Sequence, residues 1–149
     1  KRKLNSITMG TRSLTRVIEA HNENKRIVTM YRQYDGHLYS HGKDLATLLN
    51  KITLTNGKQG RGTANGIQCF AAQLIAHFKK GPGDIYLMPT DTDDAMQDYI
   101  YEISSPNGSG FYVEVFSNIK SFAFFSGDLS EFNKLISNET KSINFPLPF

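Results

Sequence analysis

The sequence predicts an α+β domain with a mainly antiparallel sheet built from hairpins and two to three helices packed on one face. Three observations support this prediction. Strand-like segments occur in pairs, strong turn sequences separate them, and strands do not alternate regularly with helices. A chain of 149 residues can bury a core of its own, so we expect residues 1–149 to form a single domain.

The first predicted hairpin lies near the start of the chain. Residues 11–19 and 27–35 alternate apolar and polar side chains, and the asparagines of residues 21–25 favour a turn between them. A helix is expected after Gly42, because apolar residues then recur at the i, i+3, i+4, i+7 spacing of one helical face: Leu45, Leu48, Leu49 and Ile52.

A glycine-rich connector is predicted over residues 56–66, which contain four glycines and no apolar periodicity. A second helix is expected over residues 67–78, where the apolar stripe is wide. Lys79 and Lys80 supply positive charge at its end, and Gly81 and Pro82 stop it.

The second half of the chain is predicted to be mostly strands. An acidic loop is expected over residues 89–98, and a turn over residues 106–110 joins the two middle strands of the set 84–88, 99–103, 111–116 and 121–126. Asp128 and Glu131 have capping-box spacing ahead of a short last helix containing Leu129, Phe132, Leu135 and Ile136.

The two ends of the chain differ from the rest. Residues 1–8 form a basic extension, and residues 141–149 are predicted to form an extended apolar tail, because Pro146 and Pro148 prevent a helix. We expect Phe145, Leu147 and Phe149 to dock into a groove of this domain or of a neighbouring subunit.

Composition excludes several classes of protein. Cys69 is the single cysteine, so no intramolecular disulfide forms and no cluster of cysteines has zinc-ligand spacing; we expect no cofactor. No apolar stretch approaches the roughly 18 residues of a membrane span, which favours a cytoplasmic protein without a membrane partner. The formal charge is +6 over residues 1–32, +4 over 33–80 and −7 over 81–149. Either the halves form separate charged faces, which favours anionic partners, or they interleave and neutralise each other.

Two short segments resemble a widespread family of small uncharacterised proteins from phages, other viruses and microbes. The segments are Met9-Gly10-Thr11-Arg12 and Tyr31-Arg32-Gln33-Tyr34-Asp35-Gly36, followed by Gly42, and the similarity covers roughly residues 9–50. The chain departs from the pattern at His37-Leu38, where the family has Tyr-Pro, and at Ser40, where it has glycine. The resemblance implies a viral or mobile-element origin and transfers no activity.

The first hairpin supplies the preferred candidate site. If Ile18 pairs with Val28, one sheet face carries Arg12, Arg16, Arg32 and Tyr34, a combination suited to gripping phosphate and stacking a base. A shift of one residue would place Arg12 opposite Asp35 and give a structural ion pair instead.

Two weaker candidate sites follow along the chain. Asp35, His37 and His41 have a spacing that suits metal ligands or a catalytic base, although a turn followed by a helix start is the preferred explanation. Lys58 and Arg61 lie in the glycine-rich connector just before the second helix, where backbone N–H groups would attract an anion. The alternative there is a mobile surface loop.

These residues lead to three ranked hypotheses. The first is a non-enzymatic binding protein for a small anionic, nucleotide-like ligand, used by a virus to sequester a host signal. The second is a structural or assembly protein that forms homo-oligomers. The third is a metal- or histidine-dependent hydrolase. Nucleic acid is the least favoured partner, because the aromatic-rich second half is acidic.

Overall fold

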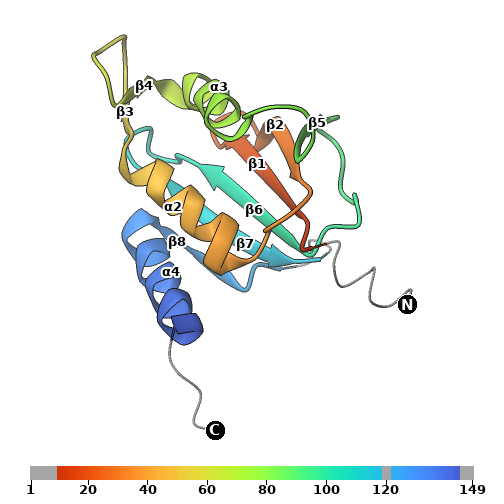
Figure 1. Cartoon of the computed structure of the whole chain (residues 1–149). Helices are drawn as coiled ribbons and strands as arrows, with labels where there is room; N and C mark the ends of the chain where they lie inside the picture. Colours follow the sequence, from red (N-terminus) through yellow and green to blue (C-terminus); the bar gives the residue numbers. More distant parts are fainter. Residues whose placement is uncertain (1–9, 119–121, 145–149) are drawn as a thin grey trace, which may run out of the picture.

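A six-stranded sheet forms the centre of the computed structural model, which describes residues 10–118 and 122–144, the last three of these by their backbone alone (Figure 1). The strands lie in the order β5-β2-β1-β6-β7-β8. Their bounds are β1 (Ser13–Glu19), β2 (Lys25–Arg32), β5 (Ile85–Met88), β6 (Tyr99–Ser104), β7 (Tyr112–Ser117) and β8 (Phe125–Asp128).

All neighbouring strands of this sheet are antiparallel except β1 and β6, which run parallel. The hairpins β1–β2 and β6–β7 are both present, so the predicted α+β class is confirmed. Three helices lie on one face of the sheet (Figure 1): α2 (Lys43–Asn50), α3 (Gly66–Phe78) and α4 (Leu129–Asn144). A single π-helical turn, η1 (Leu38–Gly42), leads into α2.

The inner face of the sheet, which the helices cover, carries the main core. Side chains on this face include Val17, Met30 and Tyr101, and none of the three is exposed. They pack against apolar residues of the three helices, among them Leu45, Leu49, Phe70, Leu74 and Phe132. The i, i+3, i+4 apolar spacing of the sequence therefore marks the helix faces that contact the sheet.

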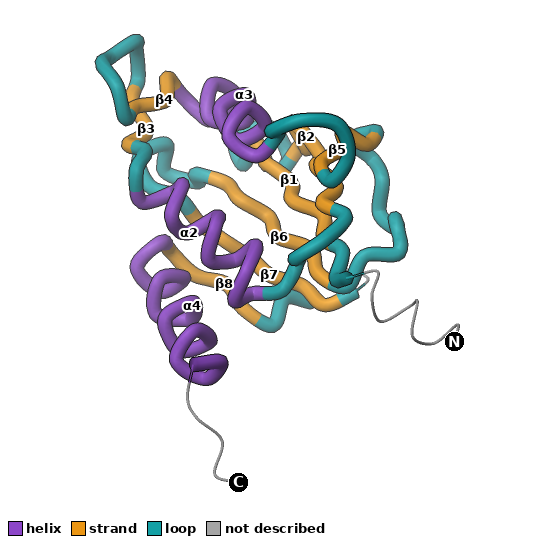
Figure 2. Tube along the Cα trace, viewed as in Figure 1, coloured by secondary structure: helices purple, strands orange, loops and turns teal. Residues whose placement is uncertain are grey.

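The outer face of the sheet carries a smaller apolar cluster and several charged side chains. Leu14, Ile100 and Phe116 are buried there, and Ala95 of the loop between β5 and β6 packs against them. Figure 2 shows the three helices on the opposite side of the strands. Loop backbone accepts hydrogen bonds from charged groups of this outer face, as the Thr92 carbonyl does from Arg16.

The register expected for the first hairpin is wrong by one residue. Val28 pairs with Val17, and a bulge between Val17 and Ile18 shifts the remaining pairs. The turn, where Glu23 and Asn24 adopt left-handed backbone angles (φ 54° and 55°), sets only the two pairs next to it, and the bulge sets the register of the pairs beyond. A shift of one residue moves every side chain of one strand to the other face relative to its partner.

The glycine-rich connector is more ordered than predicted. It contains strand β4 (Thr63–Asn65), which pairs in parallel with β3 (Thr53–Thr55) immediately before the connector. Three-residue strands give too short a pattern to be seen in the sequence, and the Thr53 N–H bonding to the Gly62 carbonyl at 2.9 Å closes the loop.

The last helix is longer than predicted. Helix α4 continues to Asn144, so residues 141–144 are helical rather than part of an extended tail. The predicted docking of Phe145, Leu147 and Phe149, and the basic extension of residues 1–8, lie outside the described residues. Within the described ranges, no helix has the length and apolar character needed to cross a membrane.

Candidate functional site

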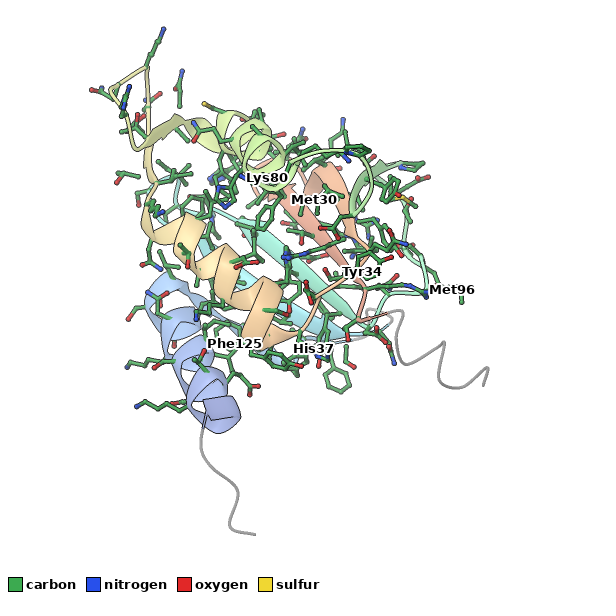
Figure 3. All side chains as sticks on the ribbon, in the orientation of Figure 1. Met30, Tyr34, His37, Lys80, Met96 and Phe125 are labelled. Atoms are coloured by element: carbon green, nitrogen blue, oxygen red, sulfur yellow. The ribbon has the colours of Figure 1, made fainter. Side chains whose placement is uncertain are left out.

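The four residues of the predicted hairpin site do not share a face. Ser13 pairs with Arg32 and Arg16 pairs with Thr29, so Arg32 points to the inner face and Arg16 to the outer face. Tyr34 lies beyond the end of β2, in the segment that leads to η1 (Figure 3). The single-face site of Arg12, Arg16, Arg32 and Tyr34 is therefore wrong, and this register, in which Ser13 pairs with Arg32, does not place Arg12 opposite Asp35 either.

Arg16 is fully buried on the outer face, and its guanidinium donates hydrogen bonds to neighbouring acceptors. Its Nη1 donates to Glu102 at 3.1 Å, its Nη2 donates to the Thr92 carbonyl at 2.9 Å, and Asp93 lies 3.5 Å from Nη2. Burial, followed by repulsion from Arg26, lowers the pKa of the Arg16 guanidinium. Arg16 therefore joins β1 to β6 and to the acidic loop, and it is not exposed to a ligand.

A second buried cluster lies on the inner face, around His41 of η1. The Arg32 Nη1 donates to His41 Nδ1 at 2.8 Å and to the Asp44 carboxylate at 3.0 Å. On the other side of the ring, His41 Nε2 lies 2.7 Å from the hydroxyl of Thr15. The rings of Phe78 and Tyr101 pack against the imidazole.

These contacts determine the tautomer of His41. An arginine can only donate, so Nδ1 must accept, and the neutral ring then carries its proton on Nε2 and donates it to Thr15. Burial, followed by repulsion from Arg32, lowers the pKa of His41 well below 6.5. Because Nε2 already carries the proton, His41 cannot remove a proton from the Thr15 hydroxyl, and the arrangement is structural.

His37 and Asp35 do not join this cluster. His37 Nε2 lies 2.5 Å from the hydroxyl of Thr11, whereas His41 bonds to Thr15. Those two threonines are four residues apart along the extended chain, or about 13 Å, so the two imidazoles meet different partners. Asp35 is exposed, with a left-handed backbone (φ 60°), as expected of a turn residue. Within the described ranges, no three His, Cys, Asp or Glu side chains are grouped to hold a metal ion.

Lys58 and Arg61 lie on the exposed loop between β3 and β4, which projects from the body of the molecule (Figure 1). Strand β4 separates them from the start of α3 at Gly66. A three-residue strand spans about 10 Å, so neither side chain is adjacent to the first N–H groups of α3 in the way the predicted anion site required.

Positively charged side chains also line a groove between α2 and α4. Its volume is about 570 Å³, and each helix contributes residues with the same i, i+3, i+4, i+7, i+8 spacing. The lining residues are Lys43, Ala46, Thr47, Asn50 and Lys51 of α2 and its C-terminal end, and Asn133, Ile136, Ser137, Thr140 and Lys141 of α4. They include three lysines and no carboxylate.

Two amides join the helices at the Lys51 end of this groove. The Asn50 Nδ2 donates to the Asn133 Oδ1 at 2.8 Å, and the Asn133 Nδ2 donates back to the Asn50 Oδ1 at 3.1 Å. Ala46 and Ile136 are buried beneath. The groove is therefore a fixed apolar floor with hydroxyl, amide and ammonium groups around it.

Sequence reasoning missed this groove for an identifiable reason. The lysines of α2 lie on the polar side of a predicted helix, but Thr140 and Lys141 lie beyond the end of the predicted last helix. The spacing of Asn133, Ser137 and Lys141, each four residues from the next, was the available signal.

Comparison of the chain with protein families, with curated proteins and with solved structures found no significant match. The resemblance of residues 9–50 to small phage and viral proteins therefore stays an expectation. The two segments that carry it meet in space, since the Gly36 N–H donates to the Thr11 carbonyl at 2.9 Å. An added Cβ at Gly36 would lie 2.9 Å from the backbone carbon of Arg12, so this contact requires glycine.

Proposed function

We propose that the protein binds a small anionic, phosphate-bearing ligand in the α2–α4 groove and does so without catalysing a reaction. The observation that supports this proposal is the lining itself, which combines three lysines with five neutral hydrogen-bonding side chains and contains no carboxylate. Ammonium groups attract phosphate oxygens, and hydroxyl and amide groups supply directed hydrogen bonds to the same oxygens.

The lysines are distributed along the groove. Lys43 and Lys51 are eight residues apart on α2, or about 12 Å along the helix axis. Lys51 lies at the end of α2 close to Asn133, near the start of α4, whereas Lys141 lies in the last turn of α4. A ligand of nucleotide size can therefore contact positive charge at either end of the groove and the hydroxyl groups of Thr47 and Ser137 between them.

The hairpin arginines do not support this function, because Arg16 and Arg32 are neutralised by carboxylates inside the molecule. The neutral, donor-bonded His41 likewise gives no support to a histidine-dependent hydrolase. Capture of a host signal in the cytoplasm by a viral protein would use such a groove, and that part of the proposal rests on the resemblance alone.

Calorimetry at low salt with pyrophosphate and a panel of nucleotides tests the proposal. We expect the double variant Lys43→Glu/Lys51→Glu to weaken binding at least tenfold, because each exposed charge contact contributes about 0.5–1 kcal/mol and the reversed charges repel the ligand. The fold should be unchanged, since both side chains are exposed.

The matched control is Lys58→Glu/Arg61→Glu, which changes the net charge equally at the β3–β4 loop. Retained binding in this control places the ligand in the groove. Loss of binding in the control alone would move the site to the loop, and a wild-type protein that binds no member of the panel would refute an anion-binding function.

A further inference from the structure

We infer that the face around strand β5 is an interface through which two copies of this chain form a two-fold symmetric dimer. The inference is independent of the proposed ligand groove, because β5 lies in the sheet edge while that groove lies between α2 and α4. An apolar patch, the open edge of β5 and the charges flanking β5 each support it.

The apolar patch surrounds the edge of β5: Tyr86 lies on the outer face with Met96 of the following loop, and Leu87 lies on the inner-face side of the same edge. The exposed fractions of Tyr86, Leu87 and Met96 are 46%, 61% and 75%, which are high for side chains of this size. Together with Tyr31 and Met88, they line a groove of about 570 Å³. Single exposed apolar side chains are common on monomers, whereas several around one groove mark a protein-binding surface.

Strand β5 is an outer strand of the sheet. Of its backbone groups that point away from β2, only some form hydrogen bonds within the described chain. The Ile85 N–H donates to the Gly83 carbonyl at 2.7 Å, and the Ile85 carbonyl accepts from the Lys79 Nζ at 2.7 Å. Backbone groups of an antiparallel strand alternate in direction, so those of Leu87 also point away from β2. Leu87 therefore presents its N–H and carbonyl at the centre of the exposed edge.

A two-fold axis beside Leu87 satisfies these groups. Each copy's Leu87 N–H then donates to the Leu87 carbonyl of the other copy, as in an antiparallel pair. Pairing along the whole of β5 is restricted for any partner strand, because β5 has only four residues, Lys79 covers its start and Pro89 follows its end without an N–H; the two-fold arrangement uses only the Leu87 groups.

The charges on either side of β5 favour the same antiparallel pairing of two copies. Lys80 precedes the strand, and the exposed carboxylates of Asp91 and Asp94 follow it. Figure 3 labels Lys80, just after α3, and Met96, in the loop that also carries the two carboxylates. In an antiparallel pair the start of one strand lies beside the end of the other, so Lys80 of each copy faces the acidic loop of its partner. A second copy is complementary to this surface at both ends at once.

Light scattering coupled to size-exclusion chromatography tests the dimer directly. We expect the wild type to show the mass of two chains at high concentration and of one chain on dilution, and Leu87→Asp to remain a folded monomer. The matched control is Phe122→Ser, which removes another exposed apolar side chain outside the patch and should leave the dimer intact. A monomeric wild type at its highest soluble concentration, or a dimeric Leu87→Asp, would overturn the inference.

A charge swap tests the two-fold geometry. Lys80→Glu and Asp91→Lys should each weaken the dimer severalfold when studied alone, because like charges then meet at both ends. An equal mixture of the two variants should form heterodimers. At one end of such a heterodimer the introduced carboxylate at position 80 faces the introduced ammonium at position 91, and at the other end the native Lys80 and Asp91 meet. A mixture no more dimeric than its components would contradict the antiparallel arrangement, even if the wild type were a dimer.

Discussion

His41 and Arg16 show how single side chains are used in this molecule. Each was singled out in the sequence as a candidate functional group, and each is fully buried with hydrogen-bond partners on neighbouring elements. A buried polar group without partners would cost about 1–3 kcal/mol, so residues of this kind are conspicuous in a sequence whether they bind a ligand or hold the fold together.

The lowered pKa of His41 predicts a pH dependence of stability. Below pH 6.5 the unfolded chain takes up a proton at this histidine while the folded protein does not, so the free energy of unfolding falls as the pH decreases. The slope for one group reaches at most about 1.4 kcal/mol per pH unit. We expect His41→Gln, which cannot titrate, to show a smaller loss of stability between about pH 7 and pH 5.

Urea unfolding across that pH range measures the difference between the two proteins. The control is His21→Gln, which replaces an exposed histidine and should leave the wild-type slope unchanged. Parallel curves for wild type and His41→Gln would show that His41 takes up its proton in the folded state.

Replacement of Arg16 should lower the stability of the fold, whereas replacement of an exposed ligand-binding arginine would not. Arg16→Met leaves the Glu102 carboxylate buried without its guanidinium partner, so we expect a loss of about 3–5 kcal/mol in the free energy of unfolding. The double variant Arg16→Met/Glu102→Gln should regain part of this loss, because it also removes the buried charge. Chemical denaturation checks both; a loss under about 1 kcal/mol in the single variant would contradict the structural role.

At the scale of the elements, the capping box at the start of α4 is the feature that the sequence predicted best. The Glu131 N–H donates to the Asp128 Oδ1 and the Asp128 N–H donates to the Glu131 Oε1, both at 2.9 Å. The reciprocal bonds confirm the spacing argument, because they depend only on residues three apart along the chain.

Removal of this cap should have a measurable cost. We expect Asp128→Ala to lower the free energy of unfolding by about 1 kcal/mol, whereas Asp128→Asn, which also caps helices well, should lower it much less. Thermal melts followed by circular dichroism compare the two variants. Equal effects of alanine and asparagine would show that the carboxylate charge, and not the hydrogen bond, stabilises the start of α4.

Local pattern predicted most of the elements, and it failed where long-range packing decides. Both main hairpins and the apolar faces of α2 and α3 follow from periodicity. The length of α4 does not, because Ser137 to Asn144 has no apolar stripe and the helix continues along α2 until shortly before Pro146. The candidate site depended on the register of the two strands, which a bulge at Val17 changes. The strands were therefore predicted correctly, but the side chains that share one face of the sheet were not.

At the scale of the whole molecule, the basic and acidic parts of the chain interleave. Strand β1 lies beside β6, and Arg16–Glu102 and Arg26–Asp93 join the basic first part of the chain to the acidic half. The charge asymmetry of the sequence is thus partly neutralised on the outer face of the sheet. The lysines that remain exposed on α2 and α4 are a smaller surplus, which no count along the chain could locate.

This interleaving predicts one cooperative unfolding transition. The hairpin β1–β2 is inserted between β5 and β6, so neither half of the sheet is continuous without the other. We expect the far-ultraviolet signal of the backbone and the near-ultraviolet signal of the tyrosines to change at the same urea concentration, as in two-state unfolding. Two separate midpoints would show that part of the sheet is stable by itself.

The parallel pairing of β1 with β6 also fixes the order in which the nascent chain can form its sheet. The hairpin β1–β2 can close within microseconds of leaving the ribosome, but β6 ends about 70 residues after β2, which takes roughly 4–14 s at about 5–20 residues per second. During that interval β1 has an open edge among other unfinished chains. Arg16, at the middle of that strand, is a charge that an intermolecular sheet would have to bury unpaired. The residue that later binds Glu102 therefore also protects the unfinished protein from aggregation while Glu102 has yet to be synthesised.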